Sequence, residues 1–164
     1  MTTTATNLSL VDTNVLVYAL YVAARHHRPA KALLDRAAAP EAAFCVAPQN
    51  LIEFYAVVTN PRRVTEPKSC EVALGAITEL LALPGLSLLP VPGDMLSRWM
   101  GLAQEQPLTG RRVFDLQLIA TMLGNGVRRI YTFNAKDFEP FQELEVIVPT
   151  LAPEPVASDP QPGT

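Results

Sequence analysis

The sequence predicts an α/β fold, a three-layer sandwich in which a central parallel sheet of about five strands lies between two layers of helices. Short apolar runs alternate with longer segments that have the 3.6-residue period of amphipathic helices. Polar residues follow some of these runs directly, which is typical of the carboxyl ends of parallel strands. The chain has 164 residues, the length of one domain. We therefore expect a single domain over residues 1–148.

The first expected strand begins near Leu8 and ends abruptly on Asp12, Thr13 and Asn14. Ligands of open α/β sheets bind outside the carboxyl ends of the strands, so Asp12 is the first candidate for chemistry. The alternative is that Asp12 or Thr13 only caps a helix starting near Val15, because short polar side chains accept hydrogen bonds from a first helical turn. This stretch alone leaves both interpretations open.

The next part of the chain predicts a helix over residues 27–39, a buried strand over residues 42–47 and a helix that runs from Pro48 until Asn60-Pro61 stops it. Glu53 lies in the middle of the latter helix among apolar neighbours. A charge in such a place must meet water, a partner group or a metal ion. Glu53 is therefore a second candidate, and an exposed helix stripe is the alternative.

Residues 69–83 predict a further helix, residues 86–89 a strand and residues 92–104 a helix that contains the only tryptophan, Trp99, expected in core or interface packing. The expected core contacts of the first of these helices are Val72, Ile77, Leu80 and Leu81.

A helix over residues 111–123 places Asp115 in one row with Ile119 and Met122, so its carboxylate belongs to the buried side. Asp115 also lies near the helix N-terminus, where the helix dipole favours its ionised form. The alternative is a simple first-turn acid without a role in a site.

Two more strands are expected over residues 127–133 and 144–148, and Asp137 between them is expected to follow a strand end as Asp12 does. Residues 149–164 contain five prolines and no apolar period. Such a segment cannot bury enough surface to fold alone, so we expect a disordered tail.

Composition restricts the class of protein. With 49% hydrophobic and 18% charged residues and no apolar run of roughly 18 residues, a membrane role is not expected. The first residues lack the pattern of a secretory signal, so a cytoplasmic protein is expected. The net charge of -3 argues against a general nucleic-acid coating protein but not against a nuclease. Cys45 and Cys70 predict neither a zinc site nor a disulfide.

Four acids, Asp12, Glu53, Asp115 and Asp137, could thus converge on one pocket. Carboxylates that close together repel one another, so their gathering makes physical sense around a hard divalent cation with oxygen ligands, Mg²⁺ or Mn²⁺. Such a site activates water and stabilises charge on a phosphate.

The sequence resembles the PIN domain family over about residues 8–148, and within it the VapC-type toxins of bacterial toxin–antitoxin pairs. The resemblance is carried by Val11-Asp-Thr-Asn-Val15, Asn50-Leu-Ile-Glu53, Phe114-Asp-Leu-Gln-Leu-Ile-Ala120 and Thr132-Phe-Asn-Ala-Lys-Asp-Phe138. It implies that Asp12, Glu53 and Asp115 form the core of the metal site, which an acid at the position of Asp137 commonly completes. Thr13 and Asn14 match residues that support the first aspartate, and Asn134 is the alternative at the fourth position.

The resemblance further implies a Mg²⁺-dependent endoribonuclease that acts on RNA as a homodimer and is held inactive by a cognate antitoxin. Arg111 and Arg112, which precede Asp115, are candidates for contacts with substrate phosphate by their position. Two alternatives share the fold, an RNA-processing nuclease that is not a toxin and a non-catalytic binding module for RNA or protein. A haloacid-dehalogenase-like phosphatase would need a second aspartate where this chain has Asn14.

Overall fold

The computed structural model describes residues 6–151. Its five strands form one all-parallel sheet in the order β3-β2-β1-β4-β5, so β1 lies at the centre and pairs with β2 and β4. The strands are β1 (Ser9–Val11), β2 (Phe44–Val46), β3 (Leu86–Leu88), β4 (Arg129–Tyr131) and β5 (Glu145–Ile147). The predicted parallel sheet is confirmed.

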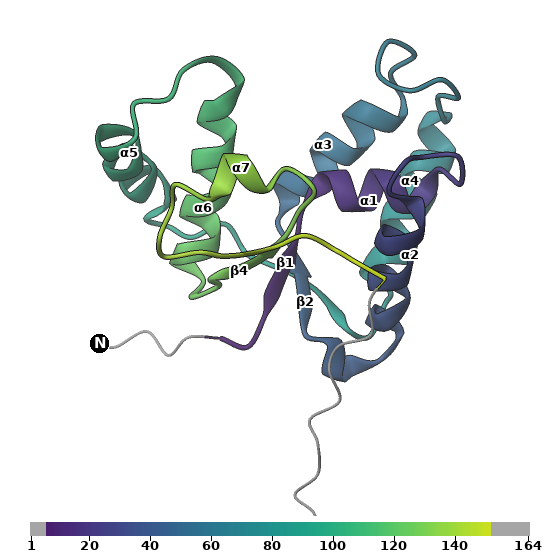
Figure 1. Cartoon of the computed structure of the whole chain (residues 1–164), viewed down its shortest axis with the longest axis horizontal. Coiled ribbons are helices and arrows are strands. Elements are labelled where there is room, and N and C mark those ends of the chain that lie inside the picture. Colours follow the sequence, from purple (N-terminus) through teal and green to yellow (C-terminus); the bar gives the residue numbers. More distant parts are fainter. Residues whose placement is uncertain (1–5, 152–164) are drawn as a thin grey trace, which may run out of the picture.

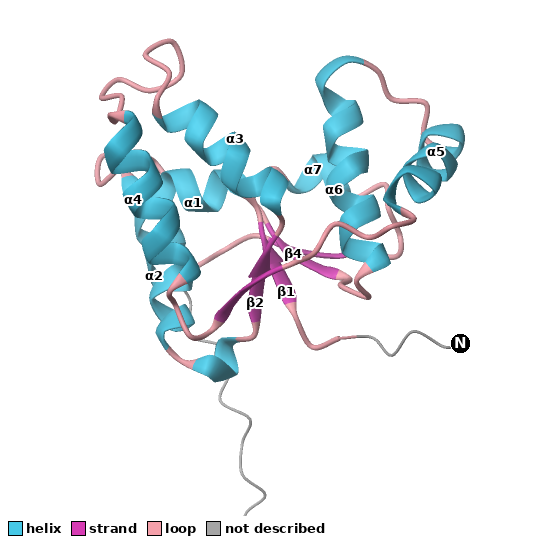
Figure 2. Cartoon of the chain, turned by 180° about the vertical axis from the view of Figure 1, so that it is seen from behind, coloured by secondary structure: helices cyan, strands magenta, loops and turns pink. Residues whose placement is uncertain are grey.

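Helices follow the strands as the sequence pattern predicts (Figures 1 and 2). They are α1 (Thr13–Leu20), α2 (His27–Asp35), α3 (Pro48–Val58), α4 (Cys70–Leu81), α5 (Met95–Glu105), α6 (Val113–Gly124) and α7 (Ala135–Phe138). Three 3₁₀ turns complete the described chain, η1 (Arg36–Ala38), η2 (Pro40–Ala42) and η3 (Gly110–Arg112).

Two apolar clusters, one on each face of the sheet, hold the three layers together. Successive strand residues point to opposite faces, so Val11 packs with α1 to α4 whereas its neighbour Leu10 packs with α5 to α7. Figure 1 shows the two groups of helices on either side of the sheet. The predicted sandwich is therefore confirmed.

Several element boundaries differ from the prediction. Helix α2 ends at Asp35 and continues as the 3₁₀ turn η1 rather than as α-helix to residue 39. The short helix α7 was not predicted, because four residues are too few to show a helical period. Asp137 follows β4 as expected, and it lies inside this helix.

The exposed side of α3 and α4 is more apolar than expected. Val72 and Leu81, expected in the core, are 51% and 41% exposed, while Ala73 is fully buried. In α3 the apolar Ile52 is 69% exposed and Glu53 is half-buried. The helix faces are thus rotated relative to the expected ones, which turns Glu53 inwards.

Most of the Pro-rich tail lies outside the described residues, which end at Leu151. Disorder of residues 149–164 and the domain boundary at residue 148 therefore stay predictions. None of the helices within residues 6–151 has the length and hydropathy that a membrane span needs.

Candidate active site

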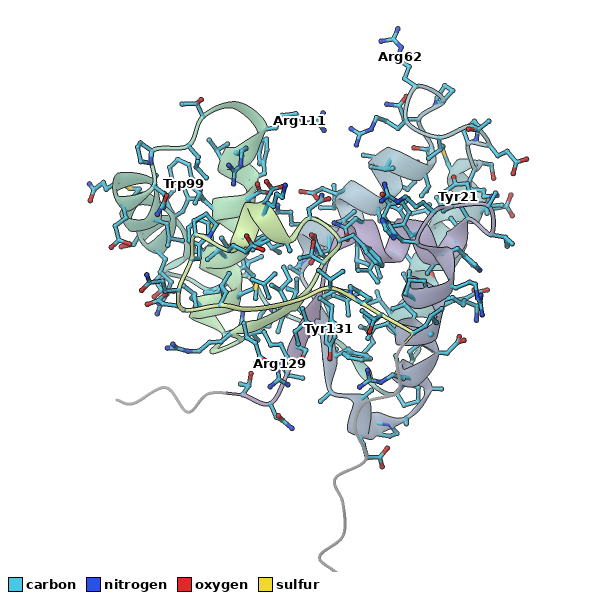
Figure 3. All side chains as sticks on the ribbon, viewed as in Figure 1. Tyr21, Arg62, Trp99, Arg111, Arg129 and Tyr131 are labelled. Carbon is cyan, nitrogen blue, oxygen red and sulfur yellow. The ribbon has the colours of Figure 1, made fainter. Side chains whose placement is uncertain are left out.

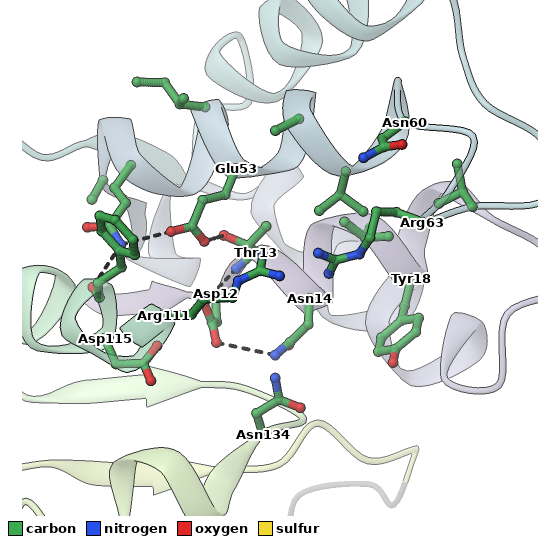
Figure 4. Close-up of a pocket in the computed structure, with 18 of the residues that line it drawn as sticks. Asp12, Thr13, Asn14, Tyr18, Glu53, Asn60, Arg63, Arg111, Asp115 and Asn134 are labelled. Carbon is green, nitrogen blue, oxygen red and sulfur yellow. Dashed lines mark hydrogen bonds between the residues drawn. The ribbon is translucent and has the colours of Figure 1, made fainter. Parts of the chain in front are cut away.

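A cavity of about 1360 Å³ lies at the carboxyl end of the sheet, between the two groups of helices. It is lined by the end of β1 and by residues of α1, α3, η3, α6, α7 and the segment between α3 and α4. All nine residues that the sequence singled out for the site lie in its lining, namely Asp12, Thr13, Asn14, Glu53, Arg111, Arg112, Asp115, Asn134 and Asp137. Figure 4 shows the central part of this cavity.

Asp12 is buried at the end of β1, where it is the N-cap of α1. One carboxylate oxygen, Oδ1, accepts a hydrogen bond from the backbone N–H of Thr13 at 2.8 Å. The other, Oδ2, accepts hydrogen bonds from Thr132 Oγ1 at 2.8 Å and from Asn14 Nδ2 at 3.2 Å. The two interpretations of Asp12 are thus compatible, since it caps α1 and faces the cavity at the same time.

Burial raises the pKa of Asp12 to about 6. The hydrogen bonds from Thr132 and Thr13 oppose this rise because they stabilise the ionised carboxylate, and the negative charges of Glu53 and Asp115 add to it. The carboxyl group of Asp12 is therefore the one whose charge depends most on what else enters the cavity.

Glu53 is fixed by two polar neighbours on α1 and α3. Its Oε2 accepts from Thr13 Oγ1 at 3.2 Å, and its Oε1 accepts from Gln49 Nε2 at 2.9 Å. Gln49 Nε2 also donates to the carbonyl oxygen of Phe114 at 2.9 Å, which ties α3 to the first turn of α6. Glu53 therefore faces the cavity from the helix opposite Asp115.

Arg112 lies between the two remaining acids. Its Nε is 3.6 Å from Asp115 Oδ2, and its Nη2 is 3.7 Å from Asp137 Oδ1 and donates to the Asp137 carbonyl oxygen at 3.2 Å. Burial and the charge of Asp137 raise the pKa of Asp115, while Arg112 opposes the rise. Asp115 lies in the first turn of α6, as predicted.

The start of α6 explains where the two arginines point. Gly110 has a positive φ of 62°, a conformation that glycine adopts without strain, and it opens the 3₁₀ turn η3 that leads into α6. This turn directs Arg112 to the acids. Arg111 is exposed and extends over the cavity from the α6 side (Figures 3 and 4).

Asn14 and Asn134 reach the same hydroxyl group from different sides. Asn14 Nδ2 donates to Thr132 Oγ1 at 3.1 Å, and the Asn134 backbone N–H donates to that oxygen at 3.0 Å. The Asn134 side chain is exposed and lines the cavity with Asp137. Asp137 and Asn134 thus both remain candidates for the fourth position.

Three further residues support the acids and were not predicted from the sequence. Thr132 bonds to Asp12, Gln49 bonds to Glu53, and the fully buried Asn50 contacts Thr13 Oγ1 through its Nδ2 at 3.3 Å. Asn50 also accepts from the Ala47 N–H at 2.9 Å, at the start of α3. A signal for Asn50 was available in the sequence, because a short polar residue beside a Pro-initiated helix start often bonds to the free N–H groups there.

The donor atoms fit a hard divalent cation. The acids offer oxygen ligands only. Burial and, to a smaller extent, the neighbouring negative charges raise the pKa values of Asp12 and Asp115, and a cation would stabilise the ionised form of both. Gln49 Oε1 and Arg112 Nε are buried without a hydrogen-bond partner. The first can accept a hydrogen bond from a bound group, and the second can donate one to it. Within residues 6–151, however, no three acidic, histidine or cysteine side chains are arranged to hold one ion. Gln49 and Thr13 instead hold Glu53, and Arg112 lies between Asp115 and Asp137.

Known proteins resemble this chain in sequence and in fold. The model of the PIN domain family matches residues 9–144. The chain is 37% identical over 118 residues to a VapC ribonuclease of Mycobacterium bovis, an alignment that covers 70% of this chain and 78% of the relative. It is 27% identical over 136 residues to ribonuclease VapC48 of Mycobacterium tuberculosis, covering 82% and 92%.

Solved structures show the same fold. VapC20 of Mycobacterium tuberculosis, a toxin that cleaves the sarcin-ricin loop, superposes with a TM-score of 0.61 at 17% identity over 82% of this chain and 95% of that chain. VapBC2 of Rickettsia felis, bound to a DNA fragment from its promoter, gives a TM-score of 0.61 at 15% identity over 87% and 99%.

Proposed function

The chain belongs to the PIN domain family, and on that premise we propose that it is a Mg²⁺-dependent endoribonuclease, the toxin of a bacterial toxin–antitoxin pair. Its curated relatives are ribonucleases, and its structural neighbours are toxins or toxin–antitoxin complexes. The observation that carries the proposal is the buried Asp12, which faces the same cavity as Glu53 and Asp115.

In this proposal Asp12, Glu53, Asp115 and Asp137 hold Mg²⁺, for which Mn²⁺ can substitute. When bound, the ion supplies activation of a water molecule and stabilisation of charge on the phosphate. Thr13 and Asn14 support the acids through the hydrogen bonds described above, and Asn134 supports Asp12 indirectly, because its backbone N–H donates to the Thr132 hydroxyl that bonds to Asp12. The gathering of oxygen ligands in one cavity supports these assignments.

Arg111 and Arg112 are proposed to contact the substrate phosphate. Arg111 is exposed above the cavity and can bind a phosphate directly. Arg112 can do so from its position between Asp115 and Asp137. Positive charges beside the acids offset the repulsion between the acidic cavity and the RNA backbone.

A cognate antitoxin and a second copy of the chain are the proposed protein partners, in the cytoplasm. Support comes from the apolar side chains on the exposed side of α3, α4 and β3, among them Ile52, Leu74 and Leu88. They line a second, smaller hollow of about 360 Å³ together with Pro48, Leu51, Tyr55 and Ile77. Exposed apolar surfaces of this kind mark association sites in soluble proteins.

An RNA cleavage assay tests the proposed activity. The purified chain should cleave single-stranded RNA with Mg²⁺ or Mn²⁺ and lose the activity in EDTA, because a carboxylate site depends on its cation. For the variant Asp12→Asn, which should be inactive, Asp94→Asn is a matched control. Asp94 is an exposed acid in an ion pair with Arg98 outside the cavity. Undiminished cleavage in EDTA would contradict the proposal.

A further inference from the structure

The cavity extends beyond the acids towards the loop of residues 59–69, which joins α3 to α4. We propose that this loop forms a second phosphate subsite, in which Arg63 binds the backbone of a nucleotide that flanks the cleaved bond in single-stranded RNA. The inference rests on the proposed nuclease function and adds a substrate contact outside the acidic cluster.

The cavity has room for a substrate larger than the reacting group. Its volume of about 1360 Å³ exceeds the roughly 300–1000 Å³ of pockets for single small ligands. The acids occupy one part of it. The other part is lined by Tyr18 and Tyr21 of the α1 segment and by Asn60, Arg63 and Glu66 of the loop.

Hydrogen bonds fix the backbone of the loop beside the cavity. Tyr21 Oη donates to the Glu66 carbonyl oxygen at 3.1 Å, and the Lys68 N–H donates to the Val58 carbonyl oxygen at 2.8 Å. The N–H groups of Arg63 and Val64 both donate to the Asn60 carbonyl oxygen, at 2.9 and 3.2 Å. The loop is therefore a preformed wall, and the position of Arg63 does not have to be created by the substrate.

The wall beside Tyr21 is also supported by ring contacts. Lys68 Nζ lies 5.0 Å from the centre of the Tyr21 ring, a cation–π contact. Tyr18 packs edge-on against Phe133 at 5.3 Å between ring centres, and His26 stacks on Phe133 at 4.4 Å. Rigid aromatic groups thus border this part of the cavity on the α1 side.

The charge of the loop suits a phosphate. Residues 59–69 contain three basic residues, Arg62, Arg63 and Lys68, and one acid, Glu66. The guanidinium group of Arg63 points into the cavity in Figure 4, and the group of Arg111 enters from the opposite wall. No ion pair of Arg63 with an acid is present within residues 6–151. A strand that crosses the acids can therefore meet one arginine on each side.

Arg62 provides a matched control for Arg63. It is the adjacent residue of the same loop and carries the same charge, but its side chain points away from the molecule in Figure 3 and it does not line the cavity. Any effect of overall loop charge should appear in both alanine variants, whereas an effect of a phosphate contact should appear only at Arg63.

Binding of a labelled single-stranded RNA to the full chain, measured by fluorescence anisotropy at several salt concentrations, tests the inference. All proteins carry Asp12→Asn, so the RNA stays intact in Mg²⁺. Arg63→Ala should weaken binding about tenfold at low salt, as expected for one charged hydrogen-bonding contact. It should also lower the slope of log Kd against log salt by about 0.7, the value for one phosphate of a single strand. Arg62→Ala should change neither value.

Cleavage kinetics separate the inference from the proposed function. With Asp12 intact, Arg63→Ala should raise KM with little change in kcat, and Arg63→Lys should restore part of the affinity. A dinucleotide substrate, which lacks the flanking phosphate, should be cleaved equally by the wild type and Arg63→Ala.

Each adverse result has a distinct meaning. If the wild type cleaves RNA but Arg62→Ala and Arg63→Ala bind alike, the loop is not a phosphate subsite, and that part of the cavity serves another ligand such as a protein partner. If the wild type cleaves no RNA, the proposed function fails, while the anisotropy comparison still decides the subsite. Loss of melting temperature in Arg63→Ala beyond that in Arg62→Ala would assign Arg63 a structural role and overturn the inference.

Discussion

Asp12 and Asp115 face the same cavity, but the molecule holds their carboxylates in different ways. Asp12 is buried and accepts three hydrogen bonds of 2.8 to 3.2 Å from the backbone of α1 and from two neighbouring side chains. Asp115 is 29% exposed at its side chain, and its ion pair with Arg112 is long, at 3.6 Å. Asp12 is therefore placed by the sheet itself, whereas Asp115 is placed by its helix and a single arginine.

Because of this difference, substitutions at the two places test different things: the loss of a charge at Asp12, and the loss of positioning of Asp115 when Arg112 is replaced. A substitution at Asp12 removes a buried carboxylate that accepts three hydrogen bonds. A substitution at Arg112 leaves every acid in place but frees Asp115 and Asp137 from their common neighbour.

Asp12→Asn should lower RNA cleavage on the order of a thousandfold, because it removes a preorganised ionised group from the reacting centre. The cap of α1 should persist, since asparagine also caps helices and its amide oxygen can accept from the Thr13 N–H as Asp12 Oδ1 does. Without metal the variant should melt no lower than the wild type, and Mg²⁺ should raise its melting temperature much less.

Cleavage rates and melting curves with and without Mg²⁺ check this expectation, with Asp94→Asn as the control. An active Asp12→Asn variant with the wild-type response to Mg²⁺ would show that Asp12 is only a helix cap.

The metal-free protein should become less stable as the pH rises between about 4 and about 6. The pKa of Asp12 is about 6 in the folded state, against the ordinary aspartate value of 3.8 that applies to the unfolded chain. Between these two values the folded state keeps a proton that the unfolded chain releases. This difference corresponds to about 3 kcal/mol of unfolding free energy. Asp115, whose pKa is also raised, acts in the same direction.

Urea unfolding at several pH values in EDTA measures the loss, and Asp12→Asn should show a much flatter dependence on pH over the same range. A wild type whose stability rises with pH in this range would contradict the assignment of a raised pKa to Asp12.

Arg112→Ala should lower cleavage by roughly ten- to a hundredfold, because Asp115 and Asp137 lose the charge that lies between them. Arg112→Lys should recover only part of the activity, since an ammonium group cannot reach both acids in the manner of a guanidinium. The melting temperature should change little, as these contacts are long and partly exposed.

Arg98→Ala is the control, because Arg98 forms an exposed ion pair with Asp94 on α5. Steady-state kinetics of RNA cleavage by Arg112→Ala, Arg112→Lys and Arg98→Ala test this prediction. Full activity in Arg112→Ala would show that Asp115 does not need the positive charge of Arg112 beside it.

The sequence was most informative where local patterns are strong. The apolar run that ends on Asp12 and the helical row that contains Asp115 predicted both residues in the cavity lining, and the described structure has them there. The helix that contains Asp137 was not predicted, because α7 has only four residues, too few for a period. The link from Thr132 to Asp12 joins residues 120 positions apart, so it depends on the pairing of β1 with β4, which no local pattern contains.

The central position of β1 has a consequence for how the site can be controlled. The backbone N–H of Asp12 donates to the Tyr131 carbonyl oxygen at 3.0 Å, which continues the pairing of β1 with β4 into the site. Such an amide should exchange its hydrogen for deuterium only when the sheet comes apart, on the slowest timescale of the molecule. Local fluctuations that leave β1 paired with β4 therefore keep the backbone of Asp12 in place, and we expect an inhibitor to act from the cavity side rather than by unfolding the sheet beneath it.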